Sequence, residues 1–108
     1  MATKIGNLFE SIPEKISDEI FSELTRGDNV RVERIVSQGQ SSPASGWYDH
    51  AENEWVAVLK GAAKIAFENG EEVHLAVGSH ITIAAHTKHK VTWTTPDTET
   101  IWLAVHYQ

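Results

Sequence analysis

The sequence predicts an all-β protein, a jelly-roll β-barrel preceded by a short N-terminal helix. From Val30 onward, apolar and polar residues alternate in short segments rich in Val, Ile, Thr and Trp. Turn residues separate these segments about every 8 to 12 positions, a spacing typical of antiparallel sandwiches and barrels. The chain has 108 residues, enough for one domain with its own core. We expect a helical extension over 1–29 that packs on a barrel over 30–108.

The helix is predicted within residues 13–24, because apolar side chains recur there about every four positions. Ser11 could cap its first turn while the Glu14 side chain reaches back to the Ser11 amide. The turn residues 26–29 should end the helix. Such a short helix is marginal alone, so its apolar stripe must pack on another element. That stripe consists of Ile16, Ile20, Phe21 and Leu24.

Eight short strands are predicted after the helix, a number that suits a jelly roll. Asn69-Gly70 is the strongest turn signal, because both central residues of a type I′ turn need positive φ. We therefore expect a hairpin there, and a surface loop over 38–46, which is rich in Gly and Ser. The predicted strands are 30–37, 46–50, 54–60, 63–68, 72–76, 80–83, 89–94 and 100–107.

The charge balance argues against a nucleic-acid partner. The chain has 15 Asp and Glu against 9 Lys and Arg, giving a net charge of −6, and phosphate binding needs clustered cations. No apolar run reaches the roughly 18 to 20 residues of a membrane span, and the N-terminal sequence lacks a secretory signal. We expect a cytoplasmic protein that does not bind membranes. The absence of cysteine excludes thiolate zinc sites and cysteine nucleophiles.

Histidine is the residue type that suggests chemistry, because all six histidines lie from His50 onward. On one uninterrupted strand, His50 and Glu54 would lie about 13 Å apart. If residues 51–53 turn the chain into an antiparallel neighbour, the two become cross-strand partners, with Cβ atoms about 5 Å apart. They could then bind one metal ion, since imidazole is a common ligand of first-row metals.

Alternation places Val56 on the face of Glu54, so this site would have an apolar floor. His89 begins another strand and could converge with His50 and Glu54. Two histidines and a carboxylate resemble the facial triad of Fe(II) sites, and three ligands with an open position also suit a catalytic zinc. His86 is a further candidate ligand, because the turn after it can bring its ring to the same side. The alternative is a cluster of hydrogen-bonded, half-buried side chains without a metal.

The segment from about Arg34 to Tyr107 resembles a small single-domain cupin. The first cupin motif ends with a histidine, three residues, a glutamate, six residues and a glycine, and this chain has that spacing. In the second cupin motif a glycine precedes a histidine, and the number of residues between them is the same as between Gly78 and His89 in this chain. The matching positions are His50, Glu54 and Gly61 in the first motif, and Gly78 and His89 in the second.

The resemblance implies a divalent metal, commonly iron, manganese, nickel or zinc, in the mouth of the barrel. Carried over residue by residue, it gives His50, Glu54 and His89 as ligands. One histidine of the usual four ligands is missing. The departures from the motifs are Tyr48 in place of that histidine, Ser42 for the opening glycine, Ala84 and His86 for the proline and glycine, and Trp93 for the final asparagine.

Other polar residues of this region receive roles by strand parity. Tyr48 and His86 are candidates for proton transfer or substrate orientation. Val56, Trp93 and His106 are expected to line the pocket, Trp93 because it shares parity with His89. By the same reasoning we interpret two histidines as surface residues, His74 and His80.

Two classes of function fit this pattern. The protein could be a metal-dependent enzyme, such as a dioxygenase or isomerase, or a hydrolytic enzyme, acting on a small organic molecule. Alternatively, it could be a non-catalytic sensor or binding module that holds a small ligand. In either case we expect a homodimer, because small cupins are often dimeric and a partner could cover an edge strand.

Overall fold

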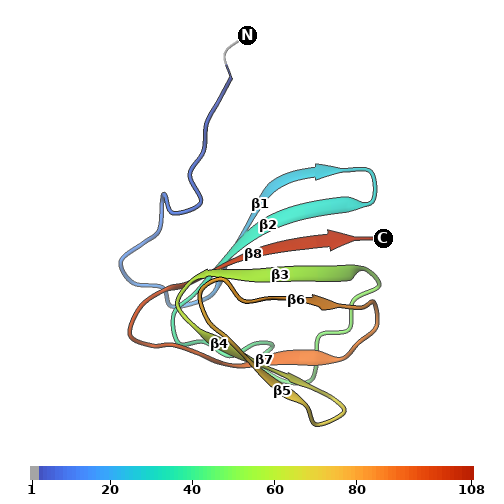
Figure 1. Cartoon of the computed structure of the whole chain (residues 1–108). Coiled ribbons are helices and arrows are strands. Elements are labelled where there is room, and N and C mark those ends of the chain that lie inside the picture. Colours follow the sequence, from blue (N-terminus) through green and yellow to red (C-terminus); the bar gives the residue numbers. More distant parts are fainter. Residues whose placement is uncertain (1–2) are drawn as a thin grey trace.

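The computed structural model describes residues 3–108 and contains eight antiparallel strands, with no helix in that range (Figure 1). The predicted all-β class is confirmed. Four strands have the predicted bounds, and three differ from them by a single residue at one end. The strands are β1 (Ile20–Gly27), β2 (Val30–Ser37), β3 (Asn53–Lys60), β4 (Ala63–Phe67), β5 (Glu72–Leu75), β6 (His80–Ile83), β7 (His89–Thr94) and β8 (Thr100–Tyr107).

The strands form two separate sheets. The larger has the order β1-β2-β8-β3-β6 and the smaller the order β5-β4-β7 (Figure 1). The expected jelly-roll barrel is therefore not closed. The predicted strand over 46–50 does not form either, and this segment contributes only the bridge between Tyr48 and His89. Gly46 has φ +76°, so the extended conformation is interrupted where that strand should begin.

The predicted N-terminal helix is wrong. Its second half is β1, which pairs with β2 from Ile20 opposite Val36 to Gly27 opposite Val30. Residues four positions apart also lie on the same face of a strand, because side chains alternate with a period of two, so the same apolar residues are compatible with a strand. The pairing edge of β2 decided between these states, as tertiary contacts often override weak helix propensity. Ser11 has φ +57°, which is not the conformation of a helix N-cap.

Polar side chains of β2 and of the residue that follows it hold the segment that precedes β1. Arg34 is 8% exposed, and its guanidinium donates hydrogen bonds to the carbonyls of Leu8 (3.1 Å) and Glu10 (2.7 Å). The amide of Ile16 donates to Oε1 of Gln38 at 3.1 Å. These contacts satisfy backbone groups of a segment that forms neither helix nor strand.

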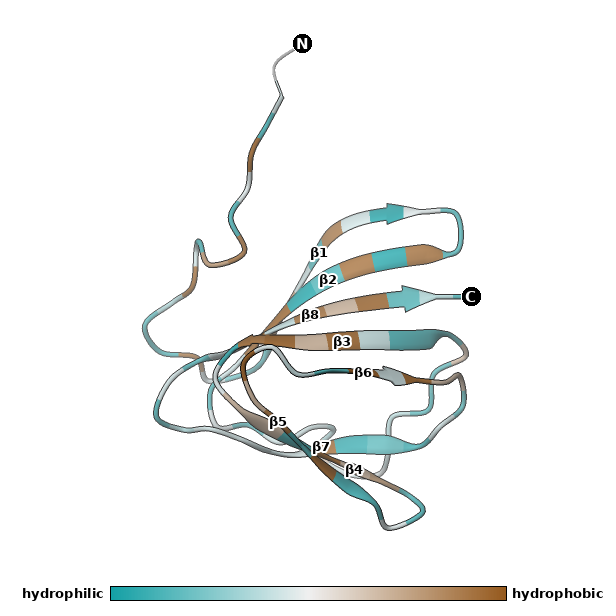
Figure 2. Cartoon of the chain, in the orientation of Figure 1, coloured by the Kyte–Doolittle hydropathy of each residue, from teal (hydrophilic) through white to brown (hydrophobic). Residues whose placement is uncertain are grey.

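The hydrophobic core is formed by buried residues of both sheets, and Figure 2 shows hydrophobic residues along several of the strands. Both sheets contribute, and several partly buried apolar residues pack around the centre. Burial of this apolar surface is the main force that holds the two layers together. The buried cluster comprises Val56, Val58, Trp102 and Ala104 of the large sheet and Ala63, Ile65 and Leu75, which belong to the small one.

The hairpin predicted at Asn69-Gly70 is confirmed, because β4 and β5 pair on either side of it. Its turn type differs from the prediction. Gly70 has φ +98°, whereas Asn69 does not adopt positive φ, so this is not a type I′ turn. The Gly70 amide donates to the Phe67 carbonyl at 2.9 Å, and the Phe67 amide donates to the carbonyl of Glu71 at 2.8 Å.

Candidate metal centre

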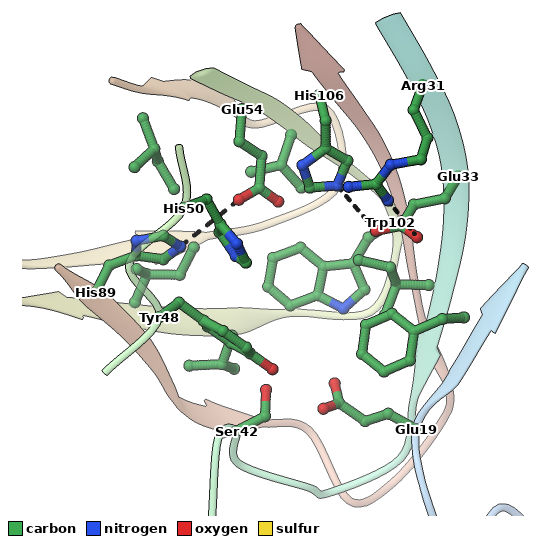
Figure 3. Close-up of a pocket in the computed structure, with 16 residues that line it drawn as sticks. Glu19, Arg31, Glu33, Ser42, Tyr48, His50, Glu54, His89, Trp102 and His106 are labelled. Atoms are coloured by element: carbon green, nitrogen blue, oxygen red, sulfur yellow. Dashed lines mark hydrogen bonds and ion pairs between the residues drawn. The ribbon is translucent and has the colours of Figure 1, made fainter. Parts of the chain in front are cut away.

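A cavity of about 280 Å³ is lined by residues of both sheets (Figure 3). Most of its wall is apolar, and polar side chains gather around His50, around Glu33 and around Glu19 (Figure 3). The residues that line it are Glu19, Phe21, Arg31, Glu33, Ile35, Ser42, Tyr48, His50, Glu54, Val56, Ile65, Ile83, His89, Val91, Trp102 and His106.

Three predicted ligands meet on the wall of this cavity. One ligand atom from each of His50, Glu54 and His89 lies within 4.8 Å of the others, and Nε2 of His89 is 3.6 Å from Oε1 of Glu54. Glu54 belongs to β3 and His89 begins β7. His50 comes from the loop before β3. This loop is attached to β7 because the Tyr48 amide donates to the His89 carbonyl (2.7 Å) and the His89 amide donates to the Tyr48 carbonyl (3.1 Å).

The imidazole of His89 is held in one orientation. Its Nδ1 lies 2.8 Å from the carbonyl of Thr87, and a carbonyl can only accept, so Nδ1 carries the proton. The other ring nitrogen, Nε2, faces Glu54, and it can bind a metal when the ring is neutral. Metal-binding histidines commonly make such a second bond, which fixes the tautomer. His89 is 4% exposed and Glu54 is 9% exposed.

The two buried groups stabilise each other's charge. Burial by itself would raise the pKa of Glu54, but the hydrogen bond from His89 and the nearby imidazoles of His106 and His50 lower it below its usual range. Burial would likewise lower the pKa of His89, yet its bonds to Glu54 and Thr87 raise the pKa above the ordinary value. Glu54 therefore stays a carboxylate at neutral pH.

The donor set fits a divalent first-row metal. Ligand atoms about 2.1 Å from one ion lie at most about 4.2 Å apart, so side-chain shifts of roughly an ångström would bring all three atoms into a coordination sphere. The 3.6 Å between His89 and Glu54 already fits. Two imidazoles and a carboxylate suit iron, manganese, nickel or zinc, although nothing in the geometry selects among these metals.

Tyr48 lies beside the cluster and lines the cavity. Its ring stacks on that of His50, with centroids 5.4 Å apart and an interplanar angle of 22°. Burial raises the pKa of the Tyr48 phenol, an effect that a hydrogen bond with Ser42 only partly offsets. The phenol is therefore neutral at pH 7 and can act as a hydrogen-bond donor.

His86 lies outside the three-residue cluster and does not line the cavity. Its side chain is 69% exposed, and Nδ1 is 3.0 Å from a carboxylate oxygen of Asp49. The backbone at this residue is left-handed, with φ +60°. Its amide donates to the His50 carbonyl at 2.7 Å, so this residue holds the His50 loop through its backbone.

Of the three residues predicted by strand parity to line the pocket, two do so and one does not. Val56 and His106 line the cavity, whereas Trp93 lies outside it and is 40% exposed. The register of β7 against β4 shifts at Thr92, between Val91 and Trp93. An extra residue in a strand reverses the side on which later side chains point, so parity counted from His89 fails beyond this bulge. The two histidines interpreted as surface residues, His74 and His80, are exposed.

Sequence reasoning missed part of the cavity wall. Arg31, Glu33 and Ile35 of β2 line it, and their alternate spacing in the sequence was an available signal. Nε2 of His106 lies 2.9 Å from a carboxylate oxygen of Glu33. Nδ1 of His106 is buried and has no hydrogen-bond partner in the structure. Glu19 was missed because its region was assigned to a helix.

Comparison with known proteins identifies the family. The cupin domain family matches residues 32–106, more than half of the chain. This chain is a cupin. No curated protein matches this cupin significantly.

Solved structures agree with this assignment. A protein from Ralstonia eutropha JMP134, named as a candidate mannose-6-phosphate isomerase, is 40% identical to this cupin with a TM-score of 0.92, over 98% of this chain and 99% of that one. A cupin superfamily protein from Desulfitobacterium hafniense DCB-2 shares 16% identity and a TM-score of 0.72, over 89% and 83% of the chains. An RmlC-like cupin from Desulfovibrio desulfuricans is 15% identical to this chain with a TM-score of 0.73, over 97% of both chains. At such low identity, the last two likenesses concern the fold alone.

A membrane-spanning helix is not found in residues 3–108: no described helix is long and apolar enough to cross a bilayer.

Proposed function

We propose that this cupin binds a divalent metal ion through His50, Glu54 and His89, and that the metal acts on a small organic molecule held in the adjoining cavity. The observation that carries the proposal is the convergence of two imidazoles and a carboxylate within 4.8 Å on the wall of a 280 Å³ cavity. Three protein ligands leave coordination positions free for a substrate.

The chain's own residues would prepare this chemistry. When bound, the metal supplies a Lewis acid that polarises an oxygen of the ligand. Thr87 holds His89 in the ligating tautomer. The neutral phenol of Tyr48, next to His50, can donate a hydrogen bond or a proton to the ligand. Apolar side chains such as Val56 and Ile65 limit access of water to the site.

The reaction class that we propose is an isomerisation or an oxygen-dependent cleavage. The relative from Ralstonia, which is named as a candidate isomerase of a sugar phosphate, supports testing isomerisation first. A binding module without catalysis is the second candidate. Its support is that, of the two proposed proton-transfer residues, Tyr48 lines the cavity and His86 does not.

Metal content tests the first step. We expect the untagged protein to hold close to one equivalent of a transition metal by plasma mass spectrometry. His50→Ala, Glu54→Gln and His89→Ala should each retain less than about a tenth of it, because each removes one of three ligands. His74→Ala, which alters an exposed histidine, serves as the matched control. Full metal content in all three ligand variants would contradict the proposal.

Turnover separates the enzyme from the binding module. The metal-loaded protein would be incubated with mannose 6-phosphate and with a panel of small phenols, keto acids and amino compounds, while oxygen uptake and NMR spectra are followed. Turnover that stops on chelation and returns with metal supports an enzyme. Saturable binding of a compound without any product supports the module.

A further inference from the structure

Glu19 places a further polar group in the cavity, across from the candidate metal ligands (Figure 3). The residue directly precedes β1 and is partly buried. Its carboxylate accepts a hydrogen bond from the Ser37 hydroxyl at 2.5 Å. Ser37 is fully buried, and its oxygen in turn accepts a bond from the indole Nε1 of Trp102 at 3.2 Å. This chain of hydrogen bonds holds the carboxylate in the cavity.

Glu19 differs from the other two carboxylates of the cavity, because no ion pair within residues 3–108 involves it. Glu33 is paired with Arg31 and with His106, and Glu54 is paired with His89. The Ser37 hydroxyl supplies one donor, and a partly desolvated carboxylate gains further from a cation or a second donor on a ligand. The Glu19 carboxylate is therefore the cavity group best placed to receive a positive or hydrogen-donating group.

An anionic ligand end would find little support there. Among the described residues that line the cavity, Arg31 is the one Lys or Arg. Its guanidinium already lies 3.4 Å from Glu33 and 3.2 Å from Glu52. A phosphate or carboxylate near Glu19 would therefore meet repulsion without a free cation to offset it.

The rest of the cavity wall is largely apolar. Phe21, Ile35 and Trp102 line the cavity, and the Trp102 indole lies between the metal ligands and Glu19 (Figure 3). Such a wall favours a hydrocarbon or aromatic body in the ligand. The cavity therefore suits a molecule with a metal-binding head, an apolar middle and a donor at its far end.

We propose that Glu19 is a specificity-determining residue that selects ligands with an ammonium group at the end remote from the metal site. That one end of the ligand binds a metal rests on the proposed function. That the other end carries an ammonium group rests on Glu19 alone, and the experiment separates these two statements.

Three hydroxamates of equal length provide the probe, because a hydroxamate chelates a metal while the other end varies. The far ends are an ammonium, a methyl and a carboxylate group. Each set of three is made with linkers of two to six carbons between the hydroxamate and the far end, and the affinity of each probe for the zinc-loaded protein is measured by calorimetry. For the best chain length we expect the ammonium probe to bind at least about tenfold more tightly than the methyl probe, and the carboxylate probe most weakly. Equal affinity of all three at every length would overturn the role of Glu19 and leave the metal proposal intact.

Variants assign the preference to the residue. Glu19→Gln keeps the shape and an oxygen for Ser37 but removes the charge, so the ammonium preference should fall to within about twofold. Glu23→Gln, which alters an exposed carboxylate on β1, should leave it unchanged. A full preference in Glu19→Gln would also overturn the proposal. If that variant does not fold, the ranking of the probes on the unaltered protein still decides.

Failure of the metal proposal has a different signature. If the protein takes up no zinc, the hydroxamates lose their anchor, and the ranking is repeated with hexylammonium, hexanol and hexanoate, which need no metal. Tighter binding of hexylammonium, lost in Glu19→Gln, would support the role of Glu19. Equal binding of the three would overturn it.

Discussion

Two independent constraints meet at Gly61, the glycine of the first cupin motif. Its φ is +85°, in the region that favours glycine. A Cβ at this position would lie 2.4 Å from the Thr100 hydroxyl and 2.7 Å from Thr100 Cα. The close approach allows β3 to turn into β4 directly against the start of β8. The motif glycine is thus explained by backbone packing and needs no role in binding.

Replacing Gly61 tests this explanation. Gly61→Ala should lower the free energy of unfolding in urea by about 3 kcal/mol, from the left-handed backbone together with the clash. Gly78→Ala, where φ is +90° and no atom lies within 4 Å, should cost only about 1 kcal/mol. Equal losses in the two variants would show that the contact with Thr100 is unimportant.

The candidate ligands illustrate how far single residues could be predicted. The spacing of His50 and Glu54 and the start of β7 at His89 were readable in the sequence, and the structure brings the three together. The predicted route, a turn that makes His50 a strand partner of Glu54, is replaced by the bridge between Tyr48 and His89. That bridge joins residues distant in the sequence, which local patterns cannot reveal.

At the scale of elements, two tryptophans on neighbouring segments show why parity can mislead. Trp93 follows the bulge in β7 and turns outward, where Lys64 lies over its ring at 5.6 Å. Trp102 of β8 is 3% exposed and donates to Ser37. The same residue type thus belongs to the surface in one strand and to the core in the other.

Leucine substitutions should separate these two environments. Trp102→Leu should lower the free energy of unfolding by about 2 to 4 kcal/mol, through a cavity and a lost hydrogen bond. Trp93→Leu should cost less than about 1 kcal/mol. Urea denaturation followed by far-UV circular dichroism measures both, and a larger loss at Trp93 would contradict the assigned environments.

The segment before β1 depends on side chains of the large sheet for its position. Arg34→Met should remove the hydrogen bonds to Leu8 and Glu10, and we expect faster amide hydrogen exchange over residues 8–16 with a loss of about 1 to 2 kcal/mol. Arg26→Met, at an exposed arginine, is the control. Unchanged exchange in Arg34→Met would mean that other contacts hold this segment.

At the scale of the whole molecule, the large sheet ends in the edge strand β1, where Phe21 is 54% exposed and Leu24 is 46% exposed. An uncovered apolar edge can pair with another chain. Homodimerisation remains a prediction, and β1 is the edge where we expect it.

Light scattering coupled to gel filtration measures the assembly. We expect twice the 12.0 kDa of one chain. Leu24→Arg should reduce the mass to that of the monomer, because it places a charge at the proposed contact. Val77→Arg, at a residue that is 67% exposed and far along the chain from β1, should leave the dimer intact. A monomeric wild-type protein would refute the prediction.

The sequence by itself determined the strands from β2 to β8, the hairpin at Asn69-Gly70 and the three candidate ligands, because alternation, turn chemistry and motif spacing are local properties. Only the tertiary structure decided that residues 20–27 form a strand, that the two sheets stay separate and that Glu19 lies in the cavity. Each of these depends on contacts that local patterns do not show: the pairing of residues 20–27 with β2, the strand order within the two sheets and the hydrogen bond from Ser37 to Glu19. A pairing edge or a buried hydrogen bond can outweigh local propensity, and neither is visible until the chain has folded.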